Sequence, residues 1–227
     1  MKRSNLGHAE TDVRIIEAAG AVFAERGFRN TTIRQITARA GVNIAAVNYH
    51  FRDKEELYVQ VLREAKRHVS WIRIEELDGT PEERFRAFIG RFVGSLLDPE
   101  RPSWHGRILA MEMANPTPAL DVIIKELTAP FYKDARTLVG QVVRGNASPA
   151  DLDLLTLSVV GQCVFYATSR PMIAKLAVDL GRHPKRLEKI AEHIAEFSLT
   201  ALHSTRPRTA VKSARTSRVR ALSSSNK

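Results

Sequence analysis

The residues best placed for chemistry lie on a short predicted helix that follows Gly41. Its outer face carries amide, phenol and imidazole groups beside small methyl groups. A single helix with such a face fits the major groove of DNA, where base edges offer hydrogen-bond partners. The residues on this face are Asn43, Ala45, Ala46, Asn48, Tyr49 and His50.

Two short helices joined by a glycine turn would position this face. Thr32 and Gln35 form a capping box at the start of the first helix, and Gly41 ends it. The apolar residues of the pair are spaced to pack against each other and against an earlier helix at residues 11–26: Ile36, Ala40, Val42, Val47 and Phe51. This pattern predicts a helix-turn-helix.

The charge of the chain is unevenly distributed. Of the 227 residues, 1–70 carry 12 Lys and Arg against 8 Asp and Glu, 71–203 carry 16 against 17, and 204–227 carry seven against none, for a net charge of +10. Basic ends attract any polyanion. Charge alone therefore leaves open a nucleic acid and an anionic membrane surface.

The sequence lacks the residue patterns that metal binding, phosphate binding and nucleophilic catalysis require. Cys163 is the single cysteine, and no second histidine, cysteine or carboxylate stands at metal-ligand spacing around His50. No glycine-rich phosphate loop is present, and Ser158 and Ser169 have no nucleophile-elbow context. We therefore expect no enzyme, no metal and no cofactor. Cys163 itself is interpreted as a small core residue, with redox sensing as the alternative.

The sequence shows neither a membrane-span pattern nor a secretory-signal pattern, and this favours a cytoplasmic protein. The longest run without Asp, Glu, Lys or Arg, residues 154–169, has 16 residues, and a membrane span needs about 20. The first residues lack the apolar run of a secretory signal. We expect no membrane partner.

The hydrophobic spacing is helical from Glu10 to His203, and no stretch sustains the alternation of a half-buried strand, so the fold class is all-α. Cap-plus-proline patterns such as Thr80-Pro81 mark several helix starts. Beyond the first three helices, the patterns predict helices at 53–75, 81–97, 103–114, 118–144, 149–168, 171–180 and 184–203. Residues 204–227 are rich in Ser, Thr and Arg, and are predicted to be a disordered basic tail.

Residues 10–58 resemble the DNA-binding domain of the TetR/AcrR family of bacterial repressors. The resemblance rests on AVFAERGF at 21–28, TTI at 31–33 and NYHFRDKEEL at 48–57. A narrower resemblance to the C-terminal domain of the CecR-type subgroup rests on MEMANPTPAL at 111–120, SVVGQCVFY at 158–166 and RP at 170–171.

The family resemblance implies a domain organisation and partners. It implies an N-terminal three-helix helix-turn-helix DNA-binding domain at 1–58 and a larger helical ligand-binding and dimerisation domain at 59–203, with the helix at 53–75 linking them. The implied function is a ligand-responsive repressor that acts as a homodimer. Its implied partners are double-stranded operator DNA and a small-molecule effector of unknown identity.

The resemblance also assigns roles to residues of the head. Thr32, Tyr49, His50 and Lys54 are expected on phosphates, where they fix position without reading sequence. Asn43 and Asn48 are expected to read adenine edges, and Ala45 and Ala46 to meet thymine methyl groups.

The candidate effector site is less specific, because aromatic and methionine side chains on helices more often form core than bind ligands. The candidate residues are Phe92, Trp104, Met111, Glu112, Phe131, Gln162, Phe165, Tyr166 and Arg170. The two charged members stand in apolar segments. They either pair with one another or orient the effector.

Two helices are expected to form the dimer interface. The segment 149–168 is apolar nearly all round, and 184–203 carries an apolar stripe, so two chains would cover these faces as a four-helix bundle. Two-fold symmetry then predicts a palindromic operator. The rival interpretations are a helical small-molecule-binding protein or enzyme with incidental basic ends, and a basic protein of membrane surfaces.

Overall fold

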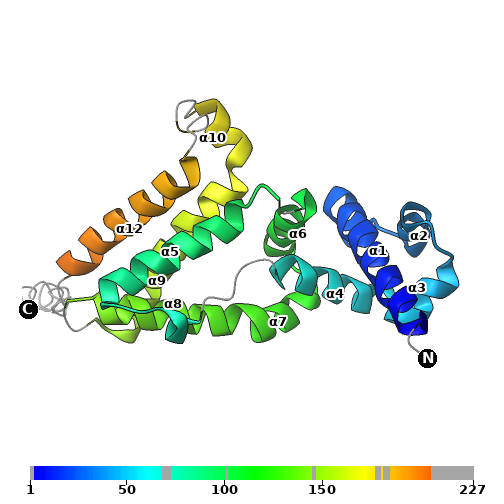
Figure 1. Ribbon diagram of the computed structural model, residues 1–227, viewed down its shortest axis with the longest axis horizontal. Helices are drawn as coiled ribbons and strands as arrows, with labels where there is room; N and C mark the ends of the chain where they lie inside the picture. The colour runs from blue at the N-terminus through cyan, green and yellow to red at the C-terminus, as the bar shows by residue number, and fades with distance from the viewer. Residues whose placement is uncertain are drawn as a thin grey trace, which may run out of the picture.

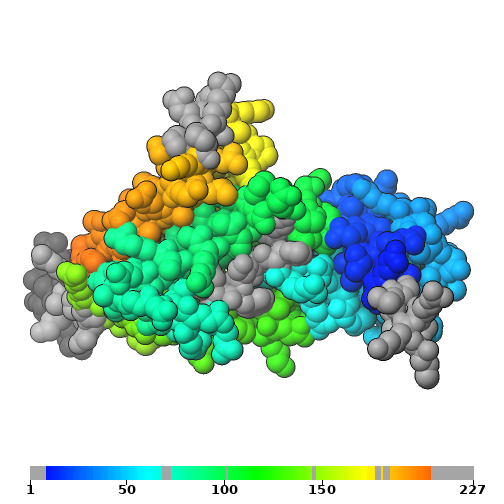
Figure 2. Space-filling model, viewed as in Figure 1, coloured from blue at the N-terminus to red at the C-terminus, as the bar shows by residue number. Residues whose placement is uncertain are grey.

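The computed structural model describes residues 3–67, 73–100, 102–144, 147–176, 180 and 185–205. Within these ranges the regular structure is helical and contains no strand, as the all-α prediction requires. The molecule is elongated (Figure 1 and Figure 2). The helices α1 to α3 form a head at one end, α5, α8, α9 and α12 form a body at the other, and α4, α6 and α7 lie between them.

The head has the predicted three helices, which are α1 (Arg3–Arg26), α2 (Ile33–Ala40) and α3 (Ile44–Phe51). The α1 helix begins eight residues before the predicted start at 11. The capping box is present: the Thr32 side chain accepts from the Gln35 amide, and the Gln35 side chain accepts from the Thr32 amide. Gly41 then ends α2 with a φ of 66°, a left-handed conformation that suits glycine.

The linking helix α4 (Lys54–Arg67) begins where its capping pattern predicts, with Asp53 Oδ1 accepting from the Glu56 amide at 2.8 Å. Its predicted end at residue 75 is wrong, because Arg73 is extended and Ile74–Glu76 form a separate short 3₁₀ turn, η1. Residues 68–72 lie outside the described residues.

The rest of the body follows the predicted order closely. Thr80 and Glu83 form the capping box that starts α5, and Pro81 is its first residue. The bounds are α5 Pro81–Leu97, α6 Ser103–Ala114, α9 Pro149–Thr168, α10 Arg170–Leu176 and α12 Arg186–Ser204. The predicted tail lies outside the described residues from 206 onward.

The predicted single helix at 118–144 is instead three consecutive segments. They are α7 (Ala119–Ile123), a π-helical turn η2 (Ile124–Thr128) and α8 (Ala129–Val142). Pro130 explains the interruption, because it has no amide to donate to the carbonyl four residues earlier and its ring crowds that turn.

Buried apolar side chains form two clusters. One joins the head to the middle of the molecule, since it contains Phe23, Ile36 and Leu57 of the head side together with Trp104 and Ile108 of α6. The other fills the body between α5, α8, α9 and α12. The head therefore shares its hydrophobic core with α6 and is not an independently packed domain.

Candidate nucleic-acid interface and effector site

The outer face of α3 is exposed, as the helix-turn-helix prediction requires. Tyr49 has 76% of its surface exposed, and Ala45 and Asn48 are exposed as well. On the opposite face, Val47 is 0% and Phe51 6% exposed. Ala46 is half-buried, so it lies at the edge of the exposed face.

Asn43 has a structural role that its spacing alone did not predict. It is the N-cap of α3, and its Oδ1 accepts the Ala46 amide at 2.8 Å. The cap uses one lone pair of Oδ1 and fixes the side chain at the helix start, so a bidentate contact to adenine would compete with the cap. Asparagine directly before an apolar helix start is itself a capping signal.

His50 lies against α1 and not on the open face. Its Nδ1 is 2.5 Å from Asp12 Oδ1, and only 11% of its side chain is exposed. This pair fixes α3 against α1, and the exposed edge of the ring is what remains for a phosphate.

Lys54 connects the start of α4 to the turn before α2. Its ammonium donates to the carbonyl oxygens of Phe28 and Thr31, both at 3.1 Å, and lies 4.4 Å from the centre of the Phe28 ring. An ammonium has three donors, so one can still turn toward a phosphate. The exposed Thr32 is the N-cap of α2. The backbone amides at the start of that helix are therefore close to Thr32, where they can bind a phosphate.

The head is fastened to α6 by a close approach at Gly20. A Cβ at this position would lie 2.5 Å from the Trp104 ring, so the ring fits only because glycine has none. The Trp104 indole also donates to Glu17 Oε2 at 2.8 Å. The Met111 methyl lies 3.3 Å from the corresponding position of Gly27, which adds a second point of contact between α6 and the head.

A buried carboxylate joins α4 to α6. Glu112, 3% exposed, accepts the Tyr58 hydroxyl at 2.7 Å on Oε2, and the amide and hydroxyl of Thr117 at 2.8 and 2.9 Å on Oε1. Glu112 and Arg170 therefore do not pair with one another. Burial, then the hydrogen bond to Glu112, raises the pKa of Tyr58, so its hydroxyl stays protonated and remains a donor.

Two further contacts fix α4 to the π-helical turn. Arg63 donates to both carboxylate oxygens of Glu126, at 2.8 and 2.7 Å, and Lys66 donates to Thr128 at 3.0 Å. Arg63 holds the pKa of Glu126 below its usual range. No local pattern predicted these pairs, because their members are 62 or 63 positions apart.

The predicted effector residues do not line one cavity. Trp104, Met111 and Glu112 lie at the junction with the head. The rings of Phe92 and Phe131 pack in a tilted arrangement in the body core, with ring centres 4.6 Å apart. Four members lie elsewhere in the body, on α9 and at the start of α10: Gln162, which donates to Ser198, half-exposed Phe165, Tyr166 and Arg170.

Tyr166 and Arg170 line a groove of about 310 Å³ between the ends of α5 and α9 and the starts of α10 and α12. Arg186 lines it too, although sequence reasoning missed this residue because it lies outside the apolar segments. Among the described residues, no group of three His, Cys, Asp or Glu side chains could hold a metal ion.

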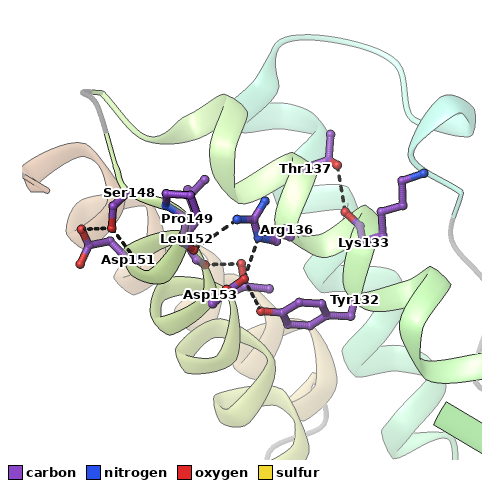
Figure 3. Close-up of polar contacts among 10 residues, drawn as sticks. Tyr132, Lys133, Arg136, Thr137, Ser148, Pro149, Asp151, Leu152 and Asp153 are labelled. Carbon is purple, nitrogen blue, oxygen red and sulfur yellow. Dashed lines mark hydrogen bonds and ion pairs between the residues drawn. The ribbon is translucent and has the colours of Figure 1, made fainter. Parts of the chain in front are cut away.

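The α9 helix is fixed to α8 by polar contacts, and its face away from the body core is open. Tyr132 and Arg136 of α8 point toward Asp153 of α9 (Figure 3), to which they donate at 2.8 and 2.7 Å. Leu154 and Leu157, on the face of α9 opposite its buried residues Thr156, Val159 and Cys163, are 60% and 57% exposed. By length and composition, α9 is also the one helix of the described part that could cross a membrane.

Comparison with known proteins identifies both parts of the chain. Residues 15–61 match the family model of bacterial regulatory proteins of the tetR family, and 81–202 match the C-terminal domain of the HTH-type transcriptional dual regulator CecR. The HTH-type transcriptional regulator RutR of Escherichia coli (strain K12) is 28% identical over 167 residues, which span 70% of this chain and 74% of RutR.

Solved structures show the same fold. AibR in complex with isovaleryl coenzyme A and operator DNA aligns with a TM-score of 0.62 and 17% identity, over 82% of this chain and 97% of AibR. FadR from Bacillus subtilis in complex with stearoyl-CoA aligns with a TM-score of 0.60 and 18% identity, over 84% and 99%. The relatives are transcriptional regulators, which rules out the enzyme interpretation. The chain belongs to the TetR family of bacterial transcriptional regulators, and its C-terminal domain is of the CecR type.

Proposed function

We propose that this regulator is a cytoplasmic repressor that binds a palindromic operator as a homodimer and leaves it when a small molecule binds the body. The observation that carries the proposal is the open face of α3, with Tyr49 76% exposed, on a head whose other helices are packed into a core shared with α6. A helix presented in this way fits the major groove.

The head contacts divide into positioning and reading. Thr32, Tyr49, His50 and Lys54 hold phosphates, which set the register of the head on the duplex. Asn48 reads a base edge, and the Ala45 and Ala46 methyl groups meet thymine methyls. Because Asn43 Oδ1 caps α3, reading of a base by Asn43 would compete with the cap, and Asn48 is the main reader.

The contacts between head and body supply a route for the effector. Any movement of α6 reaches the head through the Trp104 ring against Gly20, and through Glu112, which holds Tyr58 of α4. A rigid connection of this kind turns a small shift in the body into a change of the distance between two heads. A 100-fold loss of operator affinity needs about 2.7 kcal/mol of coupling between the two sites.

The open faces of α9 and α12 form the dimer interface in this proposal. Leu154, Leu157 and Phe165 of α9 are exposed, and so is Phe197 of α12 at 61%. Apolar side chains grouped on two adjacent helices of a soluble protein are typical of an interface between subunits. A second copy would cover them as a four-helix bundle, which also accounts for the apolar length of α9 without a membrane.

Two solved structures with the same fold indicate what kind of effector this fold can bind. The AibR structure is a complex with isovaleryl coenzyme A, and the FadR structure is a complex with stearoyl-CoA. We take from them only that this fold accommodates amphiphilic effectors.

The proposal is tested by fluorescence anisotropy on the DNA that flanks the chain's own gene, at physiological salt. A scrambled duplex of the same composition is the control. Binding that is at least about 1,000-fold tighter to the flanking DNA is the expected result. Equal affinity for both duplexes would contradict a sequence-reading head and favour a protein whose basic ends are incidental.

A further inference from the structure

The groove between α5, α9, α10 and α12 has an apolar floor. Leu97 of α5 and Ile190 of α12 are 4% and 5% exposed, and Tyr166 and Ile173 line the sides. In Figure 1, α10 rises from the end of α9 and stands beside the start of α12, so the groove lies where α5 and α9 end, on the side of the body from which the chain continues into α6. Its volume of about 310 Å³ is at the lower end of the range for small-molecule sites, about 300–1,000 Å³.

Two guanidinium groups stand at the rim. Arg170 begins α10 and Arg186 begins α12, and both line the groove, whereas no Asp or Glu is among its described lining residues. The Arg170 guanidinium donates to the Leu96 carbonyl oxygen at 3.3 Å, a neutral acceptor. Within the described ranges, no carboxylate lies within 4.0 Å of it.

The largest charge effect on Arg170 comes from another cation, Arg186. Burial, followed by the repulsion of Arg186, lowers the pKa of Arg170, and Asp98 acts in the opposite direction. Two like charges beside a partly desolvated apolar surface are stabilised by an anion that lies between them. Guanidinium groups bind carboxylates and phosphates with paired hydrogen bonds.

We propose that this groove binds a small amphiphilic anion, with its apolar part on Leu97 and Ile190 and its carboxylate or phosphate between Arg170 and Arg186. The inference rests on the proposed function, because it takes this anion to be the effector. The bound anion pulls the starts of α10 and α12 together at one end of the body. Through α5, which lies along α12, that end is connected to the rest of the core.

The binding experiment uses the full-length protein without DNA and isothermal titration calorimetry. The probes are decanoate, decyl phosphate and the neutral decanol, which share one apolar chain. Both anions are expected to bind at least about tenfold more tightly than decanol. Preference between the two anions decides whether the site takes a carboxylate or a phosphate. Equal affinity for the three probes, or no binding, would overturn the proposal.

Variants place the binding in this groove. Arg170→Gln and Arg186→Gln each remove one charge, and we expect each to raise the dissociation constant of the preferred anion about tenfold. Ala174→Phe fills the groove and leaves both arginines, and it is expected to abolish binding. Arg91→Gln, an exposed arginine on α5 outside the groove, is the matched control and should bind as the wild type does. Unchanged binding by Ala174→Phe would place the anion elsewhere and overturn the proposal.

A second measurement separates this inference from the proposed function. Operator affinity is measured with and without a saturating concentration of the preferred anion, and we expect the anion to weaken it in the wild type but not in Ala174→Phe. If the protein binds its operator but binds no anion, the inference fails while the proposed function stands. If the anion binds without changing operator affinity, its assignment as the effector is wrong. If the groove is instead closed by a second copy of the chain, the two glutamine variants will weaken the dimer and no probe will bind.

Discussion

The hydroxyl of Tyr58 donates a 2.7 Å hydrogen bond to the carboxylate of Glu112, and both side chains are buried, each 3% exposed. The two residues are 54 positions apart and belong to α4 and α6, so this bond connects the helix that carries the head to the body. Burying a carboxylate costs free energy unless hydrogen-bond donors compensate for the lost water. The Tyr58–Glu112 bond therefore stabilises the docked head, and it also connects α4 to α6.

Removing that donor should destabilise the protein measurably. Tyr58→Phe leaves Glu112 Oε2 buried without its donor, and we expect the free energy of unfolding in urea to fall by about 1–3 kcal/mol. Tyr132→Phe is the matched control: its hydroxyl also donates to a carboxylate, Asp153, at 2.8 Å, but that side chain is 46% exposed and water can replace the bond. Equal losses in the two variants would mean that the Tyr58 bond has no special role.

The close approach at Gly20 gives a second test of docking between head and body. Gly20→Ala places a methyl group 2.5 Å from the Trp104 ring, and overpacking of this kind costs about 1–3 kcal/mol. Gly90→Ala is the control, because this helical glycine has nothing within 4 Å of the new methyl group. Thermal unfolding should show a lower midpoint for the first variant and an unchanged or higher one for the second. An unchanged midpoint in Gly20→Ala would show that α6 is not tightly docked.

Local patterns in the sequence predicted the helices well, because caps and periodicity are local. The Thr32–Gln35 and Thr80–Glu83 capping boxes are present, and α5 and α9 have the predicted bounds. The π-helical turn at 124–128 was missed, although Pro130 was a local signal for it. Periodicity alone does not show where a helix changes register.

Contacts between residues far apart in the chain could not be predicted from the sequence. Trp104 was predicted to face an effector, but it packs on Gly20, 84 positions earlier. Apolar spacing shows that a side chain is buried without showing against which helix. Lys54 and Asn43 were assigned to DNA, and their contacts with the protein itself became visible only when the turn before α2 and the start of α3 were placed.

The exposed face of α3 predicts a division of labour between neighbouring residues. Tyr49→Phe removes a donor to a phosphate and should weaken binding to all duplexes by a similar factor. Asn48→Ala should change the preference at one base position by about 1–3 kcal/mol. Anisotropy with a set of single-base operator variants distinguishes the two effects. The same profile of preferences in both variants would contradict this assignment.

The thiol of Cys163 gives a prediction that depends on pH. Burial raises the pKa of Cys163 to about 12, so the native thiol should resist alkylation by iodoacetamide at pH 8 and react rapidly in urea. Because the folded pKa lies above the unfolded one, its contribution to stability is complete below the unfolded value and declines as the pH rises above it. Rapid labelling of the native protein would instead support a redox-sensing thiol.

The central claim, that two copies of α3 lie in the major groove of one operator, is tested most directly by hydroxyl-radical footprinting on the flanking DNA. Leu157→Glu places a charge on the exposed α9 face of the proposed dimer interface and should erase the footprint. The control is Leu176→Glu, on α10, where the wild-type side chain is 78% exposed, and it should keep the footprint. The account predicts two protected patches, related by a dyad and about 34 Å apart or a multiple of that. A single protected patch, or none under conditions where the protein is folded, would contradict it.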